Sequence, residues 1–443
     1  MTAPAPDTDV IVVGAGPVGL LLAGELRLGG ARVVVLERLE APTTESRAST
    51  LHARTMEIFD SRGLWDGADP PASDPRGHFA GIPLDLTLPG SRPGLWKVPQ
   101  YDTERLLGRW AERLGADVRR GHEVRAVTDT GEHVEAETVS GVLRAAYLVA
   151  CDGQDSTVRG LIGAGFPGHD ARRELLRADV DGIDVPDRRF ERLPDGLAIA
   201  ARRADGVTRV MVHEHGAPVP VRTGAPAYDE IVRAWKRVTG EDISGGTPLW
   251  VNAFDDTTRQ LTHYRHGRVL FAGDAAHRQP PIGGQALNLG LADAFDLGWK
   301  LAAEVTGRTR LLDTYHAERH PVGARALAMI EAQAALLFGG PEVDPVRALL
   351  TELLAYEPVR AQLAATVGGL DAGTRLPHST HLLHAGRGLL LGPGDPPDRD
   401  LPFAHAETWT LVRPDGHVVW EDPAQAPPPE VYDRWFGPAR KEP

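Results

Sequence analysis

Residues 9–37 read DVIVVGAGPVGLLLAGELRLGGARVVVLE, and this segment decides the fold. An apolar, β-branched run is followed at once by G-x-G-x-x-G, by helix-like leucine spacing, and by a second β-branched run that ends on Glu37. This order is typical of a dinucleotide-binding βαβ unit. Gly14 permits the tight turn, Gly16 lets the backbone approach a pyrophosphate, and Gly19 lets the helix pack on the strand. Glu37 stands where a carboxylate takes the ribose hydroxyls of an adenosine, so the segment predicts nucleotide binding.

A second glycine-rich segment, residues 273–302, reads GDAAHRQPPIGGQALNLGLADAFDLGWKLA. It follows RVLFA at 268–272, an apolar run that is typical of a short buried strand. Gly283 and Gly284 predict a turn into a helix, whose N–H groups could hold an electron-rich carbonyl or an anion. A turn without a ligand is the alternative at this point. The apolar residues that predict one helix face recur four apart: Leu287, Leu291, Phe295 and Trp299.

A third segment, CDGQDSTVR at 151–159, places Asp152 beside Gly153 after an apolar strand. An acidic residue next to glycine also occurs in simple turns. Gly273-Asp274 repeats the arrangement, so the chain has two such elements in addition to G-x-G-x-x-G. This combination favours a cofactor longer than one nucleotide, held at its pyrophosphate and again along a polyol, which describes FAD better than NAD.

Composition excludes several classes of function. The 443 residues can bury a sizeable core and predict two or three domains. A formal net charge of -13 argues against a nucleic-acid partner, because phosphate binding needs clustered positive charge. The single cysteine, Cys151, excludes an internal disulfide framework and favours a reducing cytoplasm. No export signal and no run of about 18 apolar residues is visible, so we expect no membrane span.

The remaining chain divides by pattern. Residues 171–260 alternate like strands, which predicts a mostly β domain able to wall a pocket over the cofactor. Near the C-terminus, residues 409–412 and 417–420 flank Pro414-Asp415-Gly416 and predict a hairpin. We expect an FAD-binding domain (1–75, 101–170 and 261–340), a substrate-binding domain (76–100 and 171–260) and a C-terminal region (341–443).

Histidine spacing gives no complete metal site. His316 and His320 flank Glu318, but H-A-E-R-H is not H-E-x-x-H because the glutamate occupies the wrong position. Two further groups, at 213–215 and 378–384, lack a full ligand set. No G-x-S-x-G is present, and Cys151 has no C-x-x-C partner. We therefore expect no metal.

The three signatures, GAGPVG at 14–19, CDGQDSTVR at 151–159 and GDAAHRQPPIGGQALN at 273–288, resemble those of the FAD-dependent aromatic hydroxylases of the para-hydroxybenzoate hydroxylase class. Within that class the chain is similar to bacterial hydroxylases that tailor aromatic polyketides and to rifampicin monooxygenases. The phrases ESRASTLHARTMEIFDSRG, LGADVRRGHEV, YHAERHPVG and LVRPDGHVVW share this likeness, which covers nearly the whole chain. The resemblance implies an α/β fold with a Rossmann-like FAD-binding domain, an interleaved mostly-β substrate domain, and a small truncated thioredoxin-like C-terminal region.

The same resemblance implies an activity. The enzyme would use FAD, NADPH or NADH, and dioxygen to hydroxylate a polycyclic aromatic polyketide during antibiotic biosynthesis. A flavin 4a-hydroperoxide would deliver the oxygen atom, and the protein would position the flavin and exclude water. Baeyer–Villiger oxygenation, an FAD-dependent oxidase, reductase or dehydratase, and a flavoprotein that only sequesters an aromatic drug are the alternatives. We expect a cytoplasmic monomer or homodimer without a separate nicotinamide domain.

The resemblance also implies site residues. The motif glycines would take the pyrophosphate, Glu37 the adenosine ribose, and Asp274 the ribityl chain. Asp152 and Gly153 resemble a motif tied to both FAD and nicotinamide binding. The implied cofactor residues are Gly14, Gly16, Pro17, Gly19, Glu37, Arg38, Arg47, Gln100, Val124, Asp152, Gly153, Asp274, Pro281, Gly283, Gly284, Ala286, Leu287 and Asn288. The substrate-pocket candidates are His52, His78, Trp96, His213 and His215, and no catalytic acid or base is assigned.

The chain departs from the pattern of that family in three respects. First, many members have H-x-H and G-Q-G where this chain has His277-Arg278-Gln279 and Gly284-Gln285-Ala286. Second, Ala292 and Asp296 replace a glutamine and an asparagine, and third, the linker from about 368 to 410 is shorter than in members whose thioredoxin-like tail is complete. Alanine at 286 suits the start of a helix, where φ is negative, although its methyl group could crowd the flavin.

Overall fold

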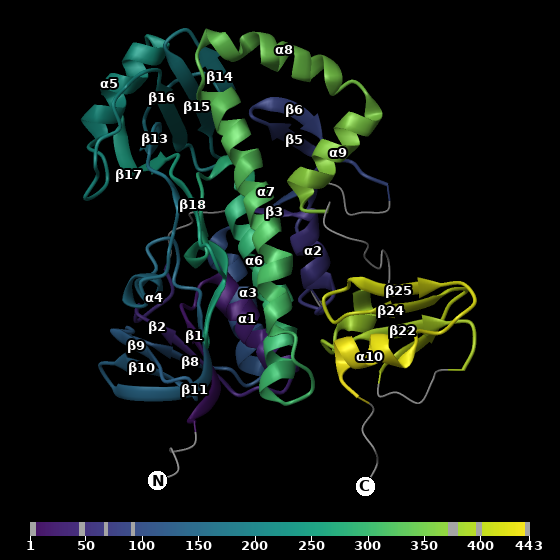
Figure 1. Cartoon of the computed structure of the whole chain (residues 1–443). Coiled ribbons are helices and arrows are strands. Elements are labelled where there is room, and N and C mark those ends of the chain that lie inside the picture. The colour runs from purple at the N-terminus through teal and green to yellow at the C-terminus, as the bar shows by residue number, and fades with distance from the viewer. Residues whose placement is uncertain are drawn as a thin grey trace.

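The main sheet lies in the lower lobe of a computed structural model, which describes residues 6–43, 49–65, 70–89, 94–370, 380–395 and 401–438 (Figure 1). Its strand order is β19-β20-β11-β1-β2-β8, with β10 added as an antiparallel partner of β11 and β9 as an antiparallel partner of β10. The valine-rich central strands pair in parallel, as expected where both faces of a sheet are covered. The strands are β1 (Thr8–Val13), β2 (Val33–Glu37), β8 (Asp117–Arg120), β9 (Ala126–Asp129), β10 (Val134–Thr138), β11 (Gly141–Ala150), β19 (Arg265–His266) and β20 (Val269–Phe271).

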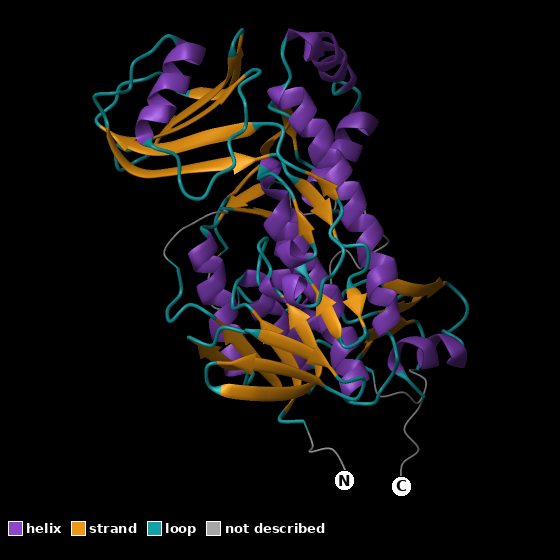
Figure 2. Cartoon of the chain, turned by 60° about the vertical axis from the view of Figure 1, so that its left-hand side comes forward, coloured by secondary structure: helices purple, strands orange, loops and turns teal. Residues whose placement is uncertain are grey.

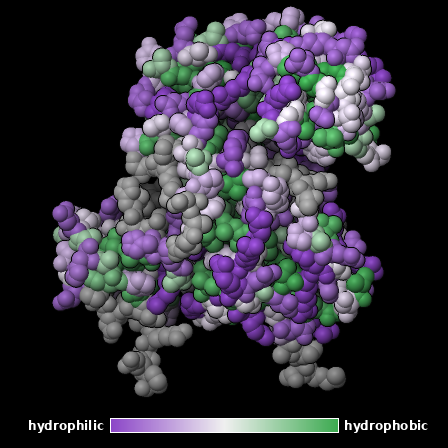
Figure 3. All heavy atoms as spheres, turned by 180° about the vertical axis from the view of Figure 1, so that it is seen from behind, coloured by the Kyte–Doolittle hydropathy of each residue, from purple (hydrophilic) through white to green (hydrophobic). Residues whose placement is uncertain are grey.

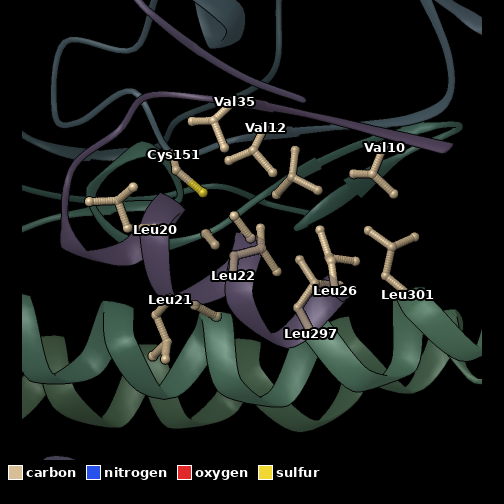
Figure 4. Close-up of a cluster of buried hydrophobic side chains, with 14 of the residues drawn as sticks. Val10, Val12, Leu20, Leu21, Leu22, Leu26, Val35, Cys151, Leu297 and Leu301 are labelled. Carbon is tan, nitrogen blue, oxygen red and sulfur yellow. The ribbon is translucent and has the colours of Figure 1, made fainter. Parts of the chain in front are cut away.

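Three helices cover one face of this sheet: α1 (Pro17–Leu28), α3 (Gln100–Arg113) and α6 (Gln285–Val305). Figure 4 shows Val10 and Val12 of the sheet facing Leu22 and Leu26 of α1, with Leu297 of α6 beneath them. All five side chains are fully buried, and burying each stabilises the fold by about 1.5–3 kcal/mol. The helices cross closely because glycines face their partners: a Cβ on Gly24 would lie 1.8 Å from the Trp110 ring.

A second, antiparallel sheet forms the upper lobe, in the order β14-β15-β16-β13-β17. Leu176, Ala178 and Val180 of β13 point to the face covered by α5, whose Trp235 is fully buried there (Figure 2). Alternation along the strand therefore directs Leu175 to the opposite, inner face. The elements are β13 (Glu174–Asp181), β14 (Arg188–Leu193), β15 (Gly196–Arg202), β16 (Thr208–Glu214), β17 (Thr247–Asp255) and α5 (Tyr228–Thr239).

The long helix α7 (Leu312–Phe338) connects the two lobes (Figure 1). Ile330 and Leu337 of this helix, Leu175 and Leu197 of the upper sheet, and Ile282 share one hydrophobic cluster. Of the described helices, α7 meets a length-and-apolarity test for a membrane span, but this buried face and Pro321 are typical of a core helix. Helices α8 (Asp344–Leu353) and α9 (Glu357–Gly368) and the hairpin of β5 (Arg76–Phe79) and β6 (Ile82–Asp85) pack nearby.

The C-terminal sheet has the order β23-β22-β24-β25. Buried Arg62 joins it to the main domain by donating to Glu25 Oε1 of α1 at 2.6 Å and to the carbonyl oxygens of Leu383 and Pro414. The predicted hairpin is confirmed, since β24 and β25 pair antiparallel. The elements are β22 (Leu389–Gly392), β23 (Phe403–His405), β24 (Trp409–Val412), β25 (Val418–Asp422) and α10 (Pro429–Phe436).

Short elements connect these layers. Helix α2 (Ala53–Asp60) begins directly after β3 (Thr50–His52), which pairs with β7 (Leu95–Lys97). Helix α3 begins at Gln100, after Pro99. The other short elements are β4 (Ser73–Asp74), β12 (Gly168–His169), β18 (Thr258–Gln260), β21 (His277–Arg278) and α4 (Thr157–Leu161).

Candidate functional site

A cavity of about 270 Å³ opens at the carboxyl ends of the parallel strands β1, β2 and β11. Ligands of open parallel sheets bind at this edge. Eight of the predicted cofactor residues line it, namely Gly14, Gly16, Glu37, Arg38, Gln100, Val124, Asp152 and Gly153. The structure adds Thr43, His122, Glu123 and Thr157, which were not among the predicted cofactor residues.

The three motif glycines have distinct steric surroundings. A Cβ on Gly14, where φ is +102°, would lie 2.4 Å from the Cys151 carbonyl oxygen. A Cβ on Gly19 would lie 2.0 Å from the Gly14 carbonyl oxygen, whereas a Cβ on Gly16 would meet nothing within 4 Å. Gly14 and Gly19 are thus required by the protein's own packing, and Gly16 faces open space. The first turn of α1 has no side-chain cap and no acidic residue, so its N–H groups suit a pyrophosphate.

Two acidic side chains border the same cavity. Glu37 accepts from the backbone N–H of Ala15 at 2.8 Å (Oε2) and of Leu39 at 2.9 Å (Oε1), which fixes its carboxylate at the end of β2. Asp152 accepts from Val158 N through Oδ2 at 3.0 Å, while its buried Oδ1 has no partner among the described residues. Burial raises the pKa of Asp152. An unsatisfied buried acceptor in a nucleotide cavity matches a ligand that donates hydrogen bonds there, such as a polyol hydroxyl.

The loops after β11 and β20 are tied together by Arg159. Its Nη1 donates to the Ala275 carbonyl at 3.1 Å and its Nη2 to the Gln154 carbonyl at 2.6 Å, with the guanidinium 4.0 Å from the Phe166 ring centre. Asp274 lies between these loops, on the turn Gly273–Ala275. The two strand-end elements inferred from sequence are therefore neighbours in space. The predicted role of Asp274 toward the ribityl chain stays a prediction.

The turn before α6 contains Pro281, Gly283 and Gly284, and the first turn of the helix contains Ala286, Leu287 and Asn288. Gly283 and Gly284 have φ of +66° and +70°, and the helix begins at Gln285, so Ala286 lies inside its first turn as expected. Asn288 fastens this turn to β3: its Nδ2 donates to the Gly284 and Thr50 carbonyls at 2.7 and 3.0 Å, and its Oδ1 accepts from His52 N at 2.8 Å. We call residues 280–288 the flavin loop.

Asp293 of α6 forms a buried ion pair near the flavin loop that the sequence analysis did not predict. Asp293 accepts from His277 Nε2 at 2.8 Å and from Arg319 Nε at 2.8 Å, and also from Gly273 N at 3.2 Å. Although burial raises the pKa of Asp293, Arg319 and His277 together hold it below its ordinary value. Helical spacing alone suggested only that residue 293 lies on α6. His277 is thus a structural link between the strand-end turn and α6.

The five substrate candidates are dispersed. His52 is buried, with Nε2 2.9 Å from the Gly283 carbonyl oxygen, and burial lowers its pKa to about 4. Trp96 is buried in the core of the main domain. His78 stacks on Phe190 at 4.3 Å, and His213 contacts Phe338 at 4.9 Å and bonds the Glu174 carbonyl at 2.8 Å. His215 lies 3.3 Å from the Pro194 carbonyl. Only His78 and His213 border the cluster that contains Ile282 of the flavin loop.

A second cavity, of about 320 Å³, is lined mainly by residues of α6, α7 and α9. Ala292 and Asp296, the two helix positions that depart from the relatives, both line it, together with His52, Arg319 and His417. Arg47 lies outside the described residues. Within the described ranges, no group of three or more histidine, cysteine, aspartate or glutamate side chains could hold a metal ion.

The residues present fit an FAD molecule. The cavity beside the open Gly16 would take the pyrophosphate and adenosine, and the uncapped N-terminus of α6 would face the isoalloxazine.

Comparison with known proteins agrees with this geometry. Residues 7–329 match the FAD binding domain family. The chain is 41% identical to a dialkyldecalin synthase from Streptomyces rugosporus and 38% identical to a rifampicin monooxygenase from Streptomyces venezuelae, in each case over 97% of this chain and 99% of the relative. A crystal structure of CabE, an aromatic hydroxylase from angucycline biosynthesis, superposes with a TM-score of 0.92 at 45% identity, covering 98% of this chain and all of that one. The chain therefore belongs to the FAD binding domain family, among its FAD-dependent monooxygenases.

Proposed function

We propose that the protein hydroxylates a polycyclic aromatic polyketide, with FAD as cofactor, NADPH or NADH as electron donor, and dioxygen as the source of the inserted atom. One observation carries the proposal: Ile282 of the flavin loop shares a hydrophobic cluster with Leu175 and Leu197 on the inner face of the upper sheet. A flat apolar substrate held against that face would lie next to the flavin loop. Figure 3 shows the surface notched between the two lobes at this level.

Each part of the chain has a separate task in this scheme. FAD, once reduced by the nicotinamide, supplies the activation of dioxygen. Gly16 and Glu37 hold its adenosine end, and Asn288 keeps the flavin loop in register with β3. The cluster around Ile282 excludes water from the reacting ring, which limits the wasteful release of hydrogen peroxide. The similarity to rifampicin monooxygenase and to CabE supports an aromatic polyketide as substrate.

Oxygen incorporation tests the proposal. The FAD-loaded protein is supplied with NADPH, ¹⁸O₂ and a polycyclic phenol, and NADPH oxidation, hydrogen peroxide and product mass are followed together. We expect substrate-stimulated NADPH oxidation and a product that is heavier by one ¹⁸O atom. NADPH oxidation that ends entirely as hydrogen peroxide with every polycyclic phenol tried would contradict hydroxylation. The same assay with NADH identifies the preferred donor.

The dialkyldecalin synthase favours a second candidate, because its name describes ring formation and it matches this chain at 41% identity over nearly the full length of both. In that case the same apolar face would fold a polyene for cyclisation without net oxidation. Turnover of a linear polyene without oxygen or nicotinamide would support it. Strict dependence of turnover on both would eliminate it.

A further inference from the structure

The inner face of the upper sheet carries an arginine that has no counter-ion of its own. Arg177 of β13 is 7% exposed, yet its Nε and Nη2 atoms have no hydrogen-bond partner among the described residues. Its guanidinium carbon lies 4.0 Å from the Trp250 ring centre and 4.7 Å from the Phe254 ring centre. Both rings belong to β17, which pairs with β13 along its whole length. Stacking on two rings fixes the position of the guanidinium group but does not satisfy its Nε and Nη2 hydrogen-bond donors.

The nearest carboxylate does not bond to these donors of Arg177. Asp179, two residues along β13, accepts from Arg209 Nε at 2.6 Å and Nη2 at 2.7 Å, and from Arg203 Nη1 at 3.3 Å. Arg203 also donates to Asp205 Oδ2 at 2.6 Å, so three arginines and two aspartates gather here, although the chain as a whole carries a charge of -13. Burial, and next the proximity of Arg209, lowers the pKa of Arg177 to about 10, which still leaves it charged at neutral pH. The face is therefore locally cationic and attracts an anion.

Arg177 lies close enough to the flavin loop for one fused-ring molecule to contact both. Leu175 precedes it by two residues on the same face of β13 and belongs to the cluster of Ile282. Two residues of a strand span about 7 Å, so a fused-ring molecule that reaches from Ile282 past Leu175 would bring its far edge to Arg177. Trp250 and Phe254 are half-buried and flank this position with apolar surface. A buried cation costs free energy unless an anion pairs with it. An unpaired buried arginine such as Arg177 is therefore expected where a bound ligand supplies that anion.

We propose that Arg177 is a substrate-binding residue that takes an acidic ring hydroxyl of the polycyclic substrate, as its phenolate, at the end remote from the flavin loop. This inference rests on the proposed function for the position of the reacting ring. The phenolate would accept hydrogen bonds from the unpartnered guanidinium nitrogens, with Asp179 engaged by Arg203 and Arg209. The arginine thereby selects substrates with an acidic hydroxyl and sets which ring faces the flavin.

Binding of two matched probes tests the proposal without turnover. The FAD-loaded full chain is titrated with 2-hydroxyanthraquinone and 2-methoxyanthraquinone in the absence of NADPH, and the visible band of the hydroxyl probe reports its ionisation. In the wild type we expect the pKa of the bound hydroxyl to fall by one unit or more. Arg177→Met should abolish that shift and raise the Kd of the hydroxyl probe about 10- to 100-fold, as for a lost hydrogen bond to a charged group. The Kd of the methoxy probe should change less than about threefold.

Controls separate this role from a structural one. Arg233→Met removes the same charge from exposed α5 on the far side of the sheet and should leave both Kd values unchanged. Arg177→Lys keeps the charge and should retain part of the ionisation shift. Arg177→Met should melt no lower than the wild type, because removing an unpaired buried cation does not weaken the fold. Equal weakening of both probes, an unshifted pKa in the wild type, or loss of FAD from Arg177→Met would overturn the proposal. The Kd values and the pKa of the bound hydroxyl test the role of Arg177 even if the protein transfers no oxygen.

Discussion

The nucleotide cavity and the inner face of the upper sheet are built by different means. The cavity is made largely of backbone: glycine turns, an uncapped helix N-terminus, and N–H groups that orient Glu37. The inner face is made of side chains that are only partly satisfied, with Arg177 between two rings and three arginines around Asp179. A site for a constant cofactor is thus fixed by the chain's own geometry, whereas the substrate face keeps interactions open for a ligand.

The strongest test of this difference is a pair of single-methyl changes at the glycine turn. Gly14→Ala forces a residue with φ of +102° and a Cβ 2.4 Å from the Cys151 carbonyl, so we expect a loss of about 3 kcal/mol or more in the free energy of unfolding, and no bound FAD. Gly16→Ala meets no protein atom, so the FAD-free protein should unfold as the wild type does while binding FAD weakly. Thermal unfolding with and without added FAD distinguishes the two. Equal melting of both FAD-free variants would contradict the assignment of Gly14 to packing and Gly16 to the ligand.

The same contrast explains what the sequence could and could not predict. The glycine motif, β1, α1 and α6 were predicted well, because turn chemistry and hydrophobic period are local properties. The short strand β3 was not predicted, because Thr50 is part of a strand only through its distant partner Lys97. The burial of Trp96 in the main domain likewise depends on its pairing with Leu51. Tertiary pairing of this kind leaves no signal in one sequence.

Arg177 shows the limit most clearly. Alternation in β13 separates Leu175, Arg177 and Asp179 from the apolar residues between them, so the sequence does indicate a mixed face. Which arginine pairs with Asp179 depends on register, and Asp179 lies opposite Arg209 of β16 while Arg177 lies opposite Met211. A shift of the register would exchange these partners. Only the assembled sheet therefore reveals which cation is left without a carboxylate.

At the cofactor end, acid should loosen the flavin loop through His52. Burial lowers its pKa to about 4, whereas the unfolded chain titrates near 6.5, so the unfolded state binds the proton first as pH falls. Neutral His52 therefore contributes at most about 3 kcal/mol to the free energy of unfolding. This contribution is fully present above pH 6.5 and is lost as the pH falls from 6.5 to 4. Thermal unfolding from pH 7.5 to 4.5 should therefore show a steeper decline for the wild type than for His52→Gln. Parallel curves would mean that His52 is not the group being titrated.

A smaller effect is expected at Glu37, whose carboxylate is held at the end of β2 by two backbone N–H groups. Glu37→Gln keeps the shape but places an amide donor against the N–H of Ala15 or of Leu39. We expect the Kd for FAD to rise about 10- to 100-fold, in line with about 1.5–3 kcal/mol for hydrogen bonds to a charged group. Fluorescence titration of the FAD-free protein measures it. Glu123→Gln borders the same cavity and serves as the matched control, and an equal loss there would show that net charge alone is responsible.

The smallest effect is expected on the substrate face, and it should leave the cofactor untouched. Trp250→Leu removes one of the two rings that hold Arg177 but keeps apolar surface at the position. Arg177 is buried but the Trp250 ring is half-exposed and the Phe254 ring remains, so we take about 0.5–1 kcal/mol for the lost cation–π contact. Affinity for 2-hydroxyanthraquinone should then fall roughly two- to fivefold while FAD content stays unchanged. The neighbouring Leu249 is exposed, and Leu249→Ala should alter neither quantity. A loss of FAD from Trp250→Leu would show that the two regions are mechanically coupled, whereas an isolated change in probe affinity would show that the substrate face can vary independently of the cofactor site.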